Sequence, residues 1–150
     1  MKVERIKQMM DACYLAKRAR EMLPSLPDGI TSAYIQYLDV IQRLEGQGMR
    51  VKVSDISDVL ALPRPGVTRT VKEMESKGCL KKCASEEDGR VTYITATEAG
   101  KALSKKYNEE YFRALAPYME RISDEDAECT IRTIEKFYQI MSERRNSLDK

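Results

Sequence analysis

The 150-residue sequence contains no histidine, so the residue most often used as a general base and as a metal ligand is missing. It also contains no Gly-rich phosphate loop and no nucleophile motif. We therefore expect neither an enzyme nor a protein that needs a cofactor. No apolar run approaches the roughly 20 residues that span a bilayer. The N-terminus lacks the apolar stretch of a signal peptide, so we expect a cytoplasmic protein without a membrane partner.

Cysteine is scarce and scattered, with residues at Cys13, Cys79, Cys83 and Cys129. In a cytosolic protein such cysteines are expected to be small buried side chains rather than disulfides. Zinc normally takes four nitrogen or sulfur ligands, and only Cys79 and Cys83 are close in sequence. The sequence therefore predicts no metal site.

Charged residues form 33% of the chain and apolar residues 42%, which is typical of a globular protein that can bury a core. The net charge is only +2, but basic residues are concentrated between Pro63 and Lys82. This segment has six basic and two acidic residues. A local basic patch is typical of a surface that binds a polyanion, and it is equally compatible with a solvated helix face.

The first half of the chain predicts two helices with apolar faces. The first spans about Val3–Met22 and ends before two prolines. The second is capped by Thr31 and ends near Gly46. Its predicted buried face consists of Tyr34, Tyr37, Leu38, Ile41 and Leu44.

The middle of the chain predicts a helix-turn-helix followed by a β-hairpin. Residues 51–53 alternate like a short strand, Ser54 caps a brief helix, and Leu62-Pro63 makes a turn. A second helix then runs from about Arg64 to Lys77 and presents Val67, Val71 and Met74 on one face. Strand-like runs at 79–84 and 91–96 flank a loop that contains Asp88-Gly89, a hairpin signal.

Two further helices are expected after the hairpin. The first starts after Thr97, carries Pro117, and has an apolar stripe of Ala99, Leu103, Tyr107, Tyr111, Leu115 and Tyr118. Ser123 and Asp126 resemble a capping box that begins the second, at about 124–145. Its stripe consists of Ala127, Ile131, Ile134, Tyr138 and Met141. Such stripes need a partner, and two-fold association is the commonest one.

Several ordered segments resemble the MarR family of winged-helix transcription factors (multiple antibiotic resistance regulators). They are Gly29-Ile30-Thr31, Val53-Ser54-Asp55-Ile56-Ser57 with Leu60, Val67-Thr68-Arg69, Met74-Glu75-Ser76-Lys77-Gly78, Asp88-Gly89-Arg90, and Ile94-Thr95-Ala96-Thr97-Glu98-Ala99-Gly100. The resemblance extends over nearly the whole chain, and the order of the helices matches throughout.

The resemblance implies a mainly α fold with a small β-hairpin wing (α+β). Residues 1–150 would form a single MarR-like domain, with a DNA-binding core at about 30–100 and dimerisation helices at 1–23 and 101–146. It also implies a homodimer that binds a pseudo-palindromic operator in double-stranded DNA. Such a protein is a sequence-specific transcriptional regulator, here expected to be a repressor released by a small molecule or another signal.

The expected DNA contacts lie on the second helix of the helix-turn-helix and on the wing. Thr68 and Arg69 are assigned to base edges in the major groove, where Arg recognises guanine. Arg64 and Lys72 are assigned to phosphates, which position the protein without specifying sequence. Arg90 corresponds to the family's minor-groove arginine, and Asp88 is expected to hold its guanidinium. In the alternative interpretation, Asp88 and Arg90 are an ordinary surface pair across the hairpin and contribute little.

The chain departs from the family pattern at the start of this helix and at the wing. Pro63 stands where a serine or similar cap is usual, and Pro65 and Gly66 occupy the first helical turn. The wing carries Glu86 and Glu87, which repel phosphate. These features motivate an alternative function, a winged-helix module that binds another protein instead of DNA.

The family often binds small phenolic or aromatic effectors between the dimer helices and the DNA-binding core. The residues expected to line such a pocket are Cys13, Tyr14, Arg18, Tyr34 and Tyr37. Aromatic residues at helical spacing equally indicate a core. Cys13 lies near the position of the reactive cysteine in the peroxide-sensing branch of the family, so a redox-sensing regulator is a further alternative. That branch has a tyrosine where this chain has Lys17.

Overall fold

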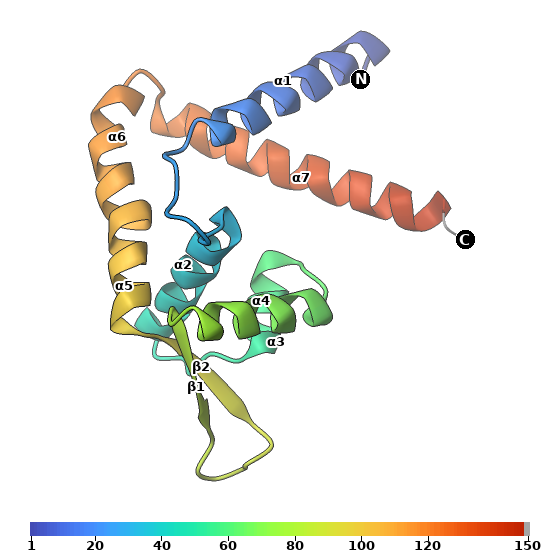
Figure 1. Cartoon of the computed structure of the whole chain (residues 1–150). Helices are drawn as coiled ribbons and strands as arrows, with labels where there is room; N and C mark the ends of the chain where they lie inside the picture. Colours follow the sequence, from blue (N-terminus) through green and yellow to red (C-terminus); the bar gives the residue numbers. More distant parts are fainter. Residues whose placement is uncertain (149–150) are drawn as a thin grey trace. The chain divides into compact units, whose positions relative to one another are not determined.

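The computed structural model of the chain describes residues 1–148 and divides them into two compact units (Figure 1). The first unit, Met1–Glu109, contains α1 (Val3–Glu21), α2 (Ser32–Gly46), α3 (Val53–Leu60), α4 (Arg64–Ser76), β1 (Leu80–Ala84), β2 (Thr92–Ala96), α5 (Glu98–Ser104) and most of the π-helical segment η1 (Lys105–Glu110). The second unit begins at Glu110 and contains α6 (Tyr111–Met119) and α7 (Asp124–Leu148). The predicted mainly helical fold with one β-hairpin is confirmed.

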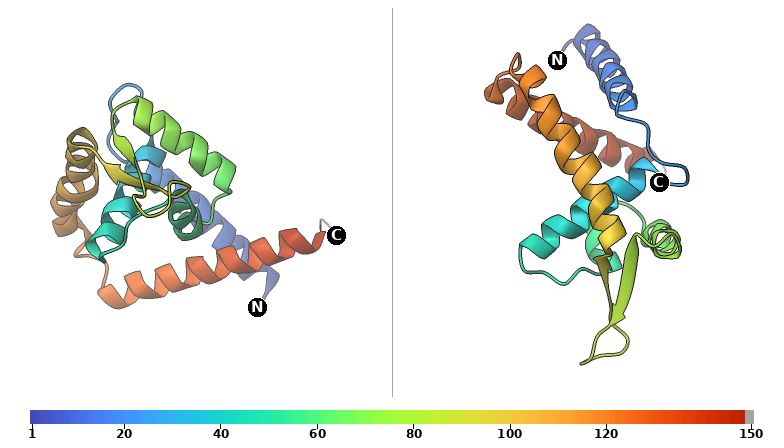
Figure 2. Two further views of the ribbon diagram at one scale, coloured as in Figure 1. Left: turned by 90° about the horizontal axis from the view of Figure 1, so that it is seen from below. Right: turned by 60° about the vertical axis from the view of Figure 1, so that its left-hand side comes forward.

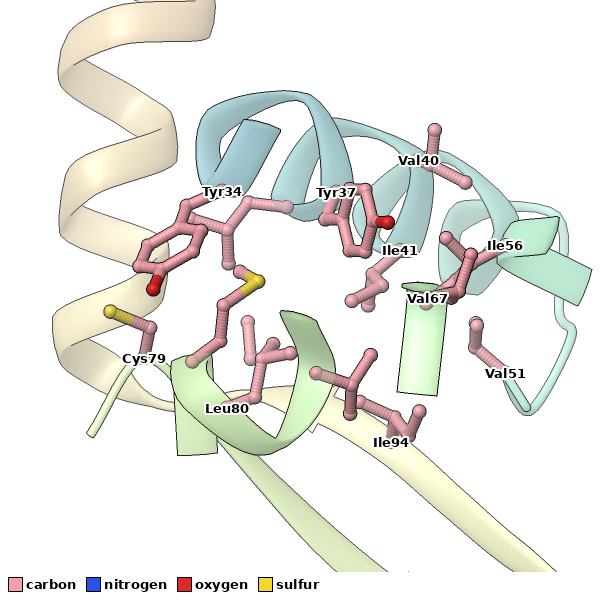
Figure 3. Close-up of a cluster of buried hydrophobic side chains, with 14 of the residues drawn as sticks. Tyr34, Tyr37, Val40, Ile41, Val51, Ile56, Val67, Cys79, Leu80 and Ile94 are labelled. Carbon is pink, nitrogen blue, oxygen red and sulfur yellow. The ribbon is translucent and has the colours of Figure 1, made fainter. Parts of the chain in front are cut away.

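Helix α2 provides the central face of the core in the first unit. Its apolar residues recur every three or four positions, and the buried ones are Tyr34, Ile35, Tyr37, Leu38, Val40, Ile41 and Leu44. Figure 3 shows Tyr37 and Ile41 of α2 in one buried cluster with Leu80 and Ile94 of the hairpin. The hydroxyl of Thr31 accepts a hydrogen bond from the Tyr34 amide (3.4 Å), so the predicted cap is confirmed.

Helices α3 and α4 form the helix-turn-helix. The predicted apolar face of α4 is confirmed, because Val67, Val71 and Met74 are fully buried. Ala61, which ends α3, adopts the left-handed conformation with φ 51°. The buried Ser57 hydroxyl donates to the carbonyl oxygen of Leu62 across 2.5 Å. This bond joins α3 to the turn that precedes α4.

The predicted strand at residues 51–53 and the cap at Ser54 are wrong. Only Val51 pairs with the hairpin, through one antiparallel bridge to Ile94. Helix α3 already begins at Val53, with Lys52 as its N-cap residue. The Asp55 carboxylate accepts a hydrogen bond from the Lys52 amide (2.8 Å), so an acidic side chain in the first turn stabilises the helix start.

Strands β1 and β2 form the wing. They pair antiparallel, from Leu80 opposite Ala96 to Ala84 opposite Thr92. At its base the hairpin is joined to the residues before α3, because the Ile94 amide donates to the Val51 carbonyl across 2.8 Å. Figure 2 shows the hairpin extending away from α2, α3 and α4, with its loop as the most distant part. The wing is therefore attached to the core at its base and exposed at its tip.

Helix α5 begins in close contact with the end of the helix-turn-helix. Thr97 caps it by accepting from the Gly100 amide (3.1 Å), as predicted. The Thr97 amide also donates to the Cys79 carbonyl (3.1 Å). Gly100 is buried beside this carbonyl, whereas Ala99, assigned to the apolar stripe, is exposed. A pattern of apolar side chains missed Gly100 because its packing depends on having no side chain.

The helix predicted after Thr97 is interrupted by η1, whose wider π-helical turns break the 3.6-residue repeat. Asn108 in this segment donates to the carbonyl oxygen of Ile35 in α2 (3.1 Å) and to the Ser104 hydroxyl (2.8 Å). Side-chain hydrogen bonds thus join η1 to α2 within the first unit.

Large apolar side chains remain exposed on the outer helices. Helix α1 has no buried residue, and its Val3, Ile6, Met10, Tyr14 and Leu15 are between 44% and 69% exposed. In the second unit, the predicted cap of α7 is confirmed, because the Ser123 hydroxyl accepts from the Asp126 amide (3.1 Å). Along α7 the exposed apolar residues include Ile131, Ile134, Tyr138 and Met141. No helix within residues 1–148 is long and apolar enough to cross a membrane.

The Gly100→Ala substitution is expected to destabilise the protein by about 2 kcal/mol, through overpacking against a fixed backbone. A Cβ at this position would lie 2.1 Å from the Cys79 carbonyl oxygen, so the backbone must shift. Gly46→Ala is the matched control, because a Cβ there meets no atom within 4 Å. Thermal unfolding followed by circular dichroism measures both. Equal stability of the two variants would contradict the close packing at Gly100.

Candidate nucleic-acid interface

The outer face of α4 combines a hydroxyl with cations. Thr68, Arg69 and Lys72 are exposed on this face, opposite the buried Val67 and Val71. Arg64, the first residue of the helix, is also exposed. Among residues 1–148, no carboxylate forms an ion pair with any of these cations. The structure therefore brings together the four α4 residues that the sequence assigned to DNA, and it leaves their polar groups accessible.

Helix α4 begins regularly despite its two prolines. Pro63 is the N-cap residue, and its carbonyl accepts a hydrogen bond from the Val67 amide (3.2 Å). Pro65 lies in the first turn, where a missing amide hydrogen removes no helical hydrogen bond. The prolines therefore leave the first turn helical, and the Ser57–Leu62 bond joins the preceding turn to α3.

The tip of the wing is organised by its own side chains. The Asp88 carboxylate accepts from the Arg90 amide (3.0 Å), and the Ser85 hydroxyl accepts from the amides of Glu87 and Asp88 (both 3.3 Å). The Arg90 side chain is 96% exposed, and its Nε lies 4.0 Å from Asp88. Asp88 thus makes its hydrogen bond to the backbone of Arg90 and leaves the guanidinium accessible. Glu86 and Glu87 are also exposed at this tip.

The sequence did not predict a hydrogen bond that joins α2 to α4. The hydroxyl of Tyr34 in α2 donates to Oε2 of Glu73 in α4 across 3.2 Å. Burial raises the pKa of Tyr34 above its usual value of 10.0, and the hydrogen bond and negative charge of Glu73 raise it further. The hydroxyl is therefore a protonated donor at neutral pH. The two residues are 39 positions apart, and no local pattern connects them.

The residues assigned to an effector pocket lie in two different environments. Tyr34 and Tyr37 are each 3% exposed and belong to the core cluster (Figure 3). Tyr14 and Arg18 on α1 are exposed, and Cys13 is partly exposed. The two tyrosines of α2 thus pack as core residues, and the effector-binding role of the set stays a prediction.

The sequence also did not indicate a shallow pocket at the base of the wing. It has a volume of about 230 Å³ and is lined by residues 45 and 49–51 together with Cys83 and residues 93–95. The Arg50 guanidinium lies 3.9 Å from the centre of the Tyr93 ring. The Thr95 hydroxyl donates to Glu45 across 2.7 Å. These contacts attach the wing to the end of α2.

The cysteines are all free thiols. Cys79 is buried, and this burial raises the pKa of its thiol, so the thiol stays protonated at neutral pH. Cys83 and Cys129 are exposed. Within residues 1–148, no group of three or more cysteine, aspartate or glutamate side chains is placed to hold a metal ion.

Comparison with known proteins shows a similarity to the MarR family. Residues 28–91 match the model of the MarR family, and no curated protein matches the chain. A MarR family protein from Bacillus stearothermophilus is similar in structure, with 26% identity, coverage of 95% of this chain and 99% of that one, and a TM-score of 0.60.

Two structures at lower identity share the fold. Streptococcus pneumoniae FabT, solved in complex with DNA, is 20% identical, with coverage of 95% and 99% and a TM-score of 0.68. The PcaV transcriptional regulator from Streptomyces coelicolor, solved with its natural ligand, is 16% identical, with coverage of 89% of each chain and a TM-score of 0.62. The match over residues 28–91 and the shared fold show that this chain is similar to the MarR family of winged-helix transcriptional regulators.

Proposed function

We propose that this protein is a homodimeric, sequence-specific DNA-binding repressor that a signal releases from its operator. The observation that carries this proposal is the outer face of α4, where Arg69 and Lys72 have no carboxylate partner among residues 1–148. A helix with one buried face and one cationic face can enter a major groove, where Arg binds guanine O6 and N7 in a bidentate manner. The structure of FabT bound to DNA supports this use of the fold.

Each residue has a separate role in the proposed complex. Thr68 and Arg69 contact base edges, while Arg64 and Lys72 contact phosphates. Arg90 enters a minor groove, and its 96% exposure on the wing suits this role. Asp88 holds the backbone from which the Arg90 side chain extends.

The proposed dimer is supported by the exposed apolar faces of the outer helices. Side chains such as Tyr14 on α1 and Tyr138 on α7 are each 62% exposed in the single chain. Apolar surface on this scale is typical of an interface. Two-fold association buries it and presents two copies of α4 to a pseudo-palindromic operator.

The proposed releasing signal is a small aromatic or phenolic molecule. Its binding residues remain the predicted set of Cys13, Tyr14, Arg18, Tyr34 and Tyr37. PcaV, a regulator with this fold, was solved with its natural ligand, which supports regulation by a bound small molecule.

We expect duplex DNA from the chain's own promoter region to bind tightly at low salt. Affinity should fall about a thousandfold between about 50 mM and 200 mM salt, because each phosphate contact releases counterions. Fluorescence anisotropy at a series of salt concentrations measures this slope. Absence of binding to any duplex at low salt would refute the proposal and favour a module that binds another protein through the acidic wing tip.

Arg69→Ala and Lys72→Ala are expected to affect DNA binding in different ways. Loss of a base contact at Arg69 should weaken the specific site by about 1–3 kcal/mol and reduce discrimination against random duplex. Loss of a phosphate contact at Lys72 should weaken both duplexes alike and reduce the salt slope by about one unit. Competition titrations measure both effects. Equal losses on specific and random DNA in both variants would contradict the assigned roles.

Ile131→Glu combined with Ile134→Glu is expected to convert the dimer into a monomer. The two side chains are 57% and 47% exposed on α7, and charges there would have to be desolvated in the interface. Lys136→Glu, an exposed position elsewhere around the helix, is the control and should remain dimeric. Sedimentation velocity measures the mass. A stable dimer of the double variant would exclude this face of α7 from the interface.

A further inference from the structure

The hydrogen bond between Tyr34 and Glu73 connects the core to the cationic helix of the proposed interface. Tyr34 lies in the first turn of α2 and is 3% exposed, whereas Glu73 is exposed on α4. A hydrogen bond to an ionised carboxylate is stronger than one between neutral groups, and a buried hydroxyl that lost this partner would be left unsatisfied. The carboxylate of Glu73 is therefore bonded to a donor whose ring is packed in the core.

Glu73 has a second potential partner on its own helix. Arg69 precedes it by four residues, the spacing at which opposite charges pair on an α-helix. No ion pair forms between them in the described chain, and Glu73 instead accepts the hydrogen bond from Tyr34. A cation at the earlier position is the weaker order for such a pair, so one competing donor is enough to prevent it.

Lys77 follows Glu73 by four residues and also has the spacing for an ion pair. Its Nζ instead lies beside Gly29, at 2.6 Å from the position that a Cβ would occupy. The residue pairs Tyr34–Glu73 and Gly29–Lys77 thus bring the start of α2 against the second half of α4. Both contacts give a charged side chain at the end of α4 a neighbour at the start of α2 instead of a partner one turn away along the chain.

We propose that Tyr34 is a positioning residue for DNA recognition, because it holds the Glu73 carboxylate away from Arg69 and leaves this guanidinium free to bind a base. The inference rests on the proposed function, in which Arg69 reads sequence. Without the hydroxyl of Tyr34, Glu73 would turn to Arg69 and would also bring a negative charge toward the phosphates. Tyr34 would then act through Glu73 and not through a contact with DNA.

The test compares specific-duplex affinity in Tyr34→Phe, Glu73→Gln and the double variant. Tyr34→Phe keeps the ring in the core and should weaken binding about twofold per DNA-binding helix, the effect expected of one exposed ion pair at this helical spacing. Glu73→Gln has no charge to release, so adding Tyr34→Phe to it should cause no further loss. A purely structural role would give the same loss in both backgrounds.

A second comparison leaves the core unchanged. Glu73→Asp keeps the charge, but its shorter side chain does not reach the Tyr34 hydroxyl, so it should weaken specific binding as Tyr34→Phe does. Glu73→Gln keeps the length and the acceptor oxygen without the charge and should not. This pair of exposed variants decides the matter even if Tyr34→Phe fails to fold.

The outcomes distinguish a failure of the positioning role of Tyr34 from a failure of the proposed DNA-binding function. If wild-type protein binds duplex and Tyr34→Phe or Glu73→Asp binds equally well, the positioning role is refuted and the proposed function stands. A loss of the same size in the Glu73→Gln background also refutes it. If wild-type protein binds no duplex at low salt, the proposed function itself fails, and the positioning role fails with it.

Discussion

The buried face of α2 is the surface on which the rest of the first unit depends. Leu38 and Ile41 are completely buried there, and α3, α5 and β2 all pack against this helix. Burial of apolar side chains is the main favourable term in folding. Because α4 and the wing reach the core through the same cluster, the position of the proposed DNA-binding face follows from the packing around α2.

Helix α4 serves stability with one face and DNA recognition, as proposed, with the opposite face. Its apolar face is fully buried and contributes stability, while its polar face carries cations that form no ion pairs within residues 1–148. Leaving cations unpaired costs little at an exposed surface, and it preserves them for a polyanion. The helix also carries two carboxylates, of which Glu75 pairs with Lys82 and Glu73 accepts a hydrogen bond from Tyr34 of the core. Both carboxylates thus have partners other than the exposed cations of α4.

Local chemistry explains which parts of the fold were predictable. The caps at Thr31 and Thr97 were identified because a hydroxyl that accepts from an amide two or three residues later is a local signal. The apolar faces of α2 and α4 followed from the helical repeat. The predicted start of α3 was wrong, because residues 51–53 alternate like a strand in the sequence. In the structure, the hydrogen bond from the Lys52 amide to Asp55 stabilises a helix that already begins at Val53. The π-helical turns of η1 have no signal in a 3.6-residue repeat.

The sequence by itself determined the order of the elements, the family resemblance, and the set of side chains on the outer face of α4 and the wing. Only the tertiary structure decided which polar side chains have a hydrogen-bond or ion-pair partner. The sequence placed Tyr34 in a predicted effector-binding set, and the structure adds that its buried side chain donates a hydrogen bond to Glu73. The close approach of Gly100 to Cys79 likewise joins residues 21 positions apart. A one-dimensional pattern reports which face a residue is on, whereas contacts between distant segments depend on how those faces pack.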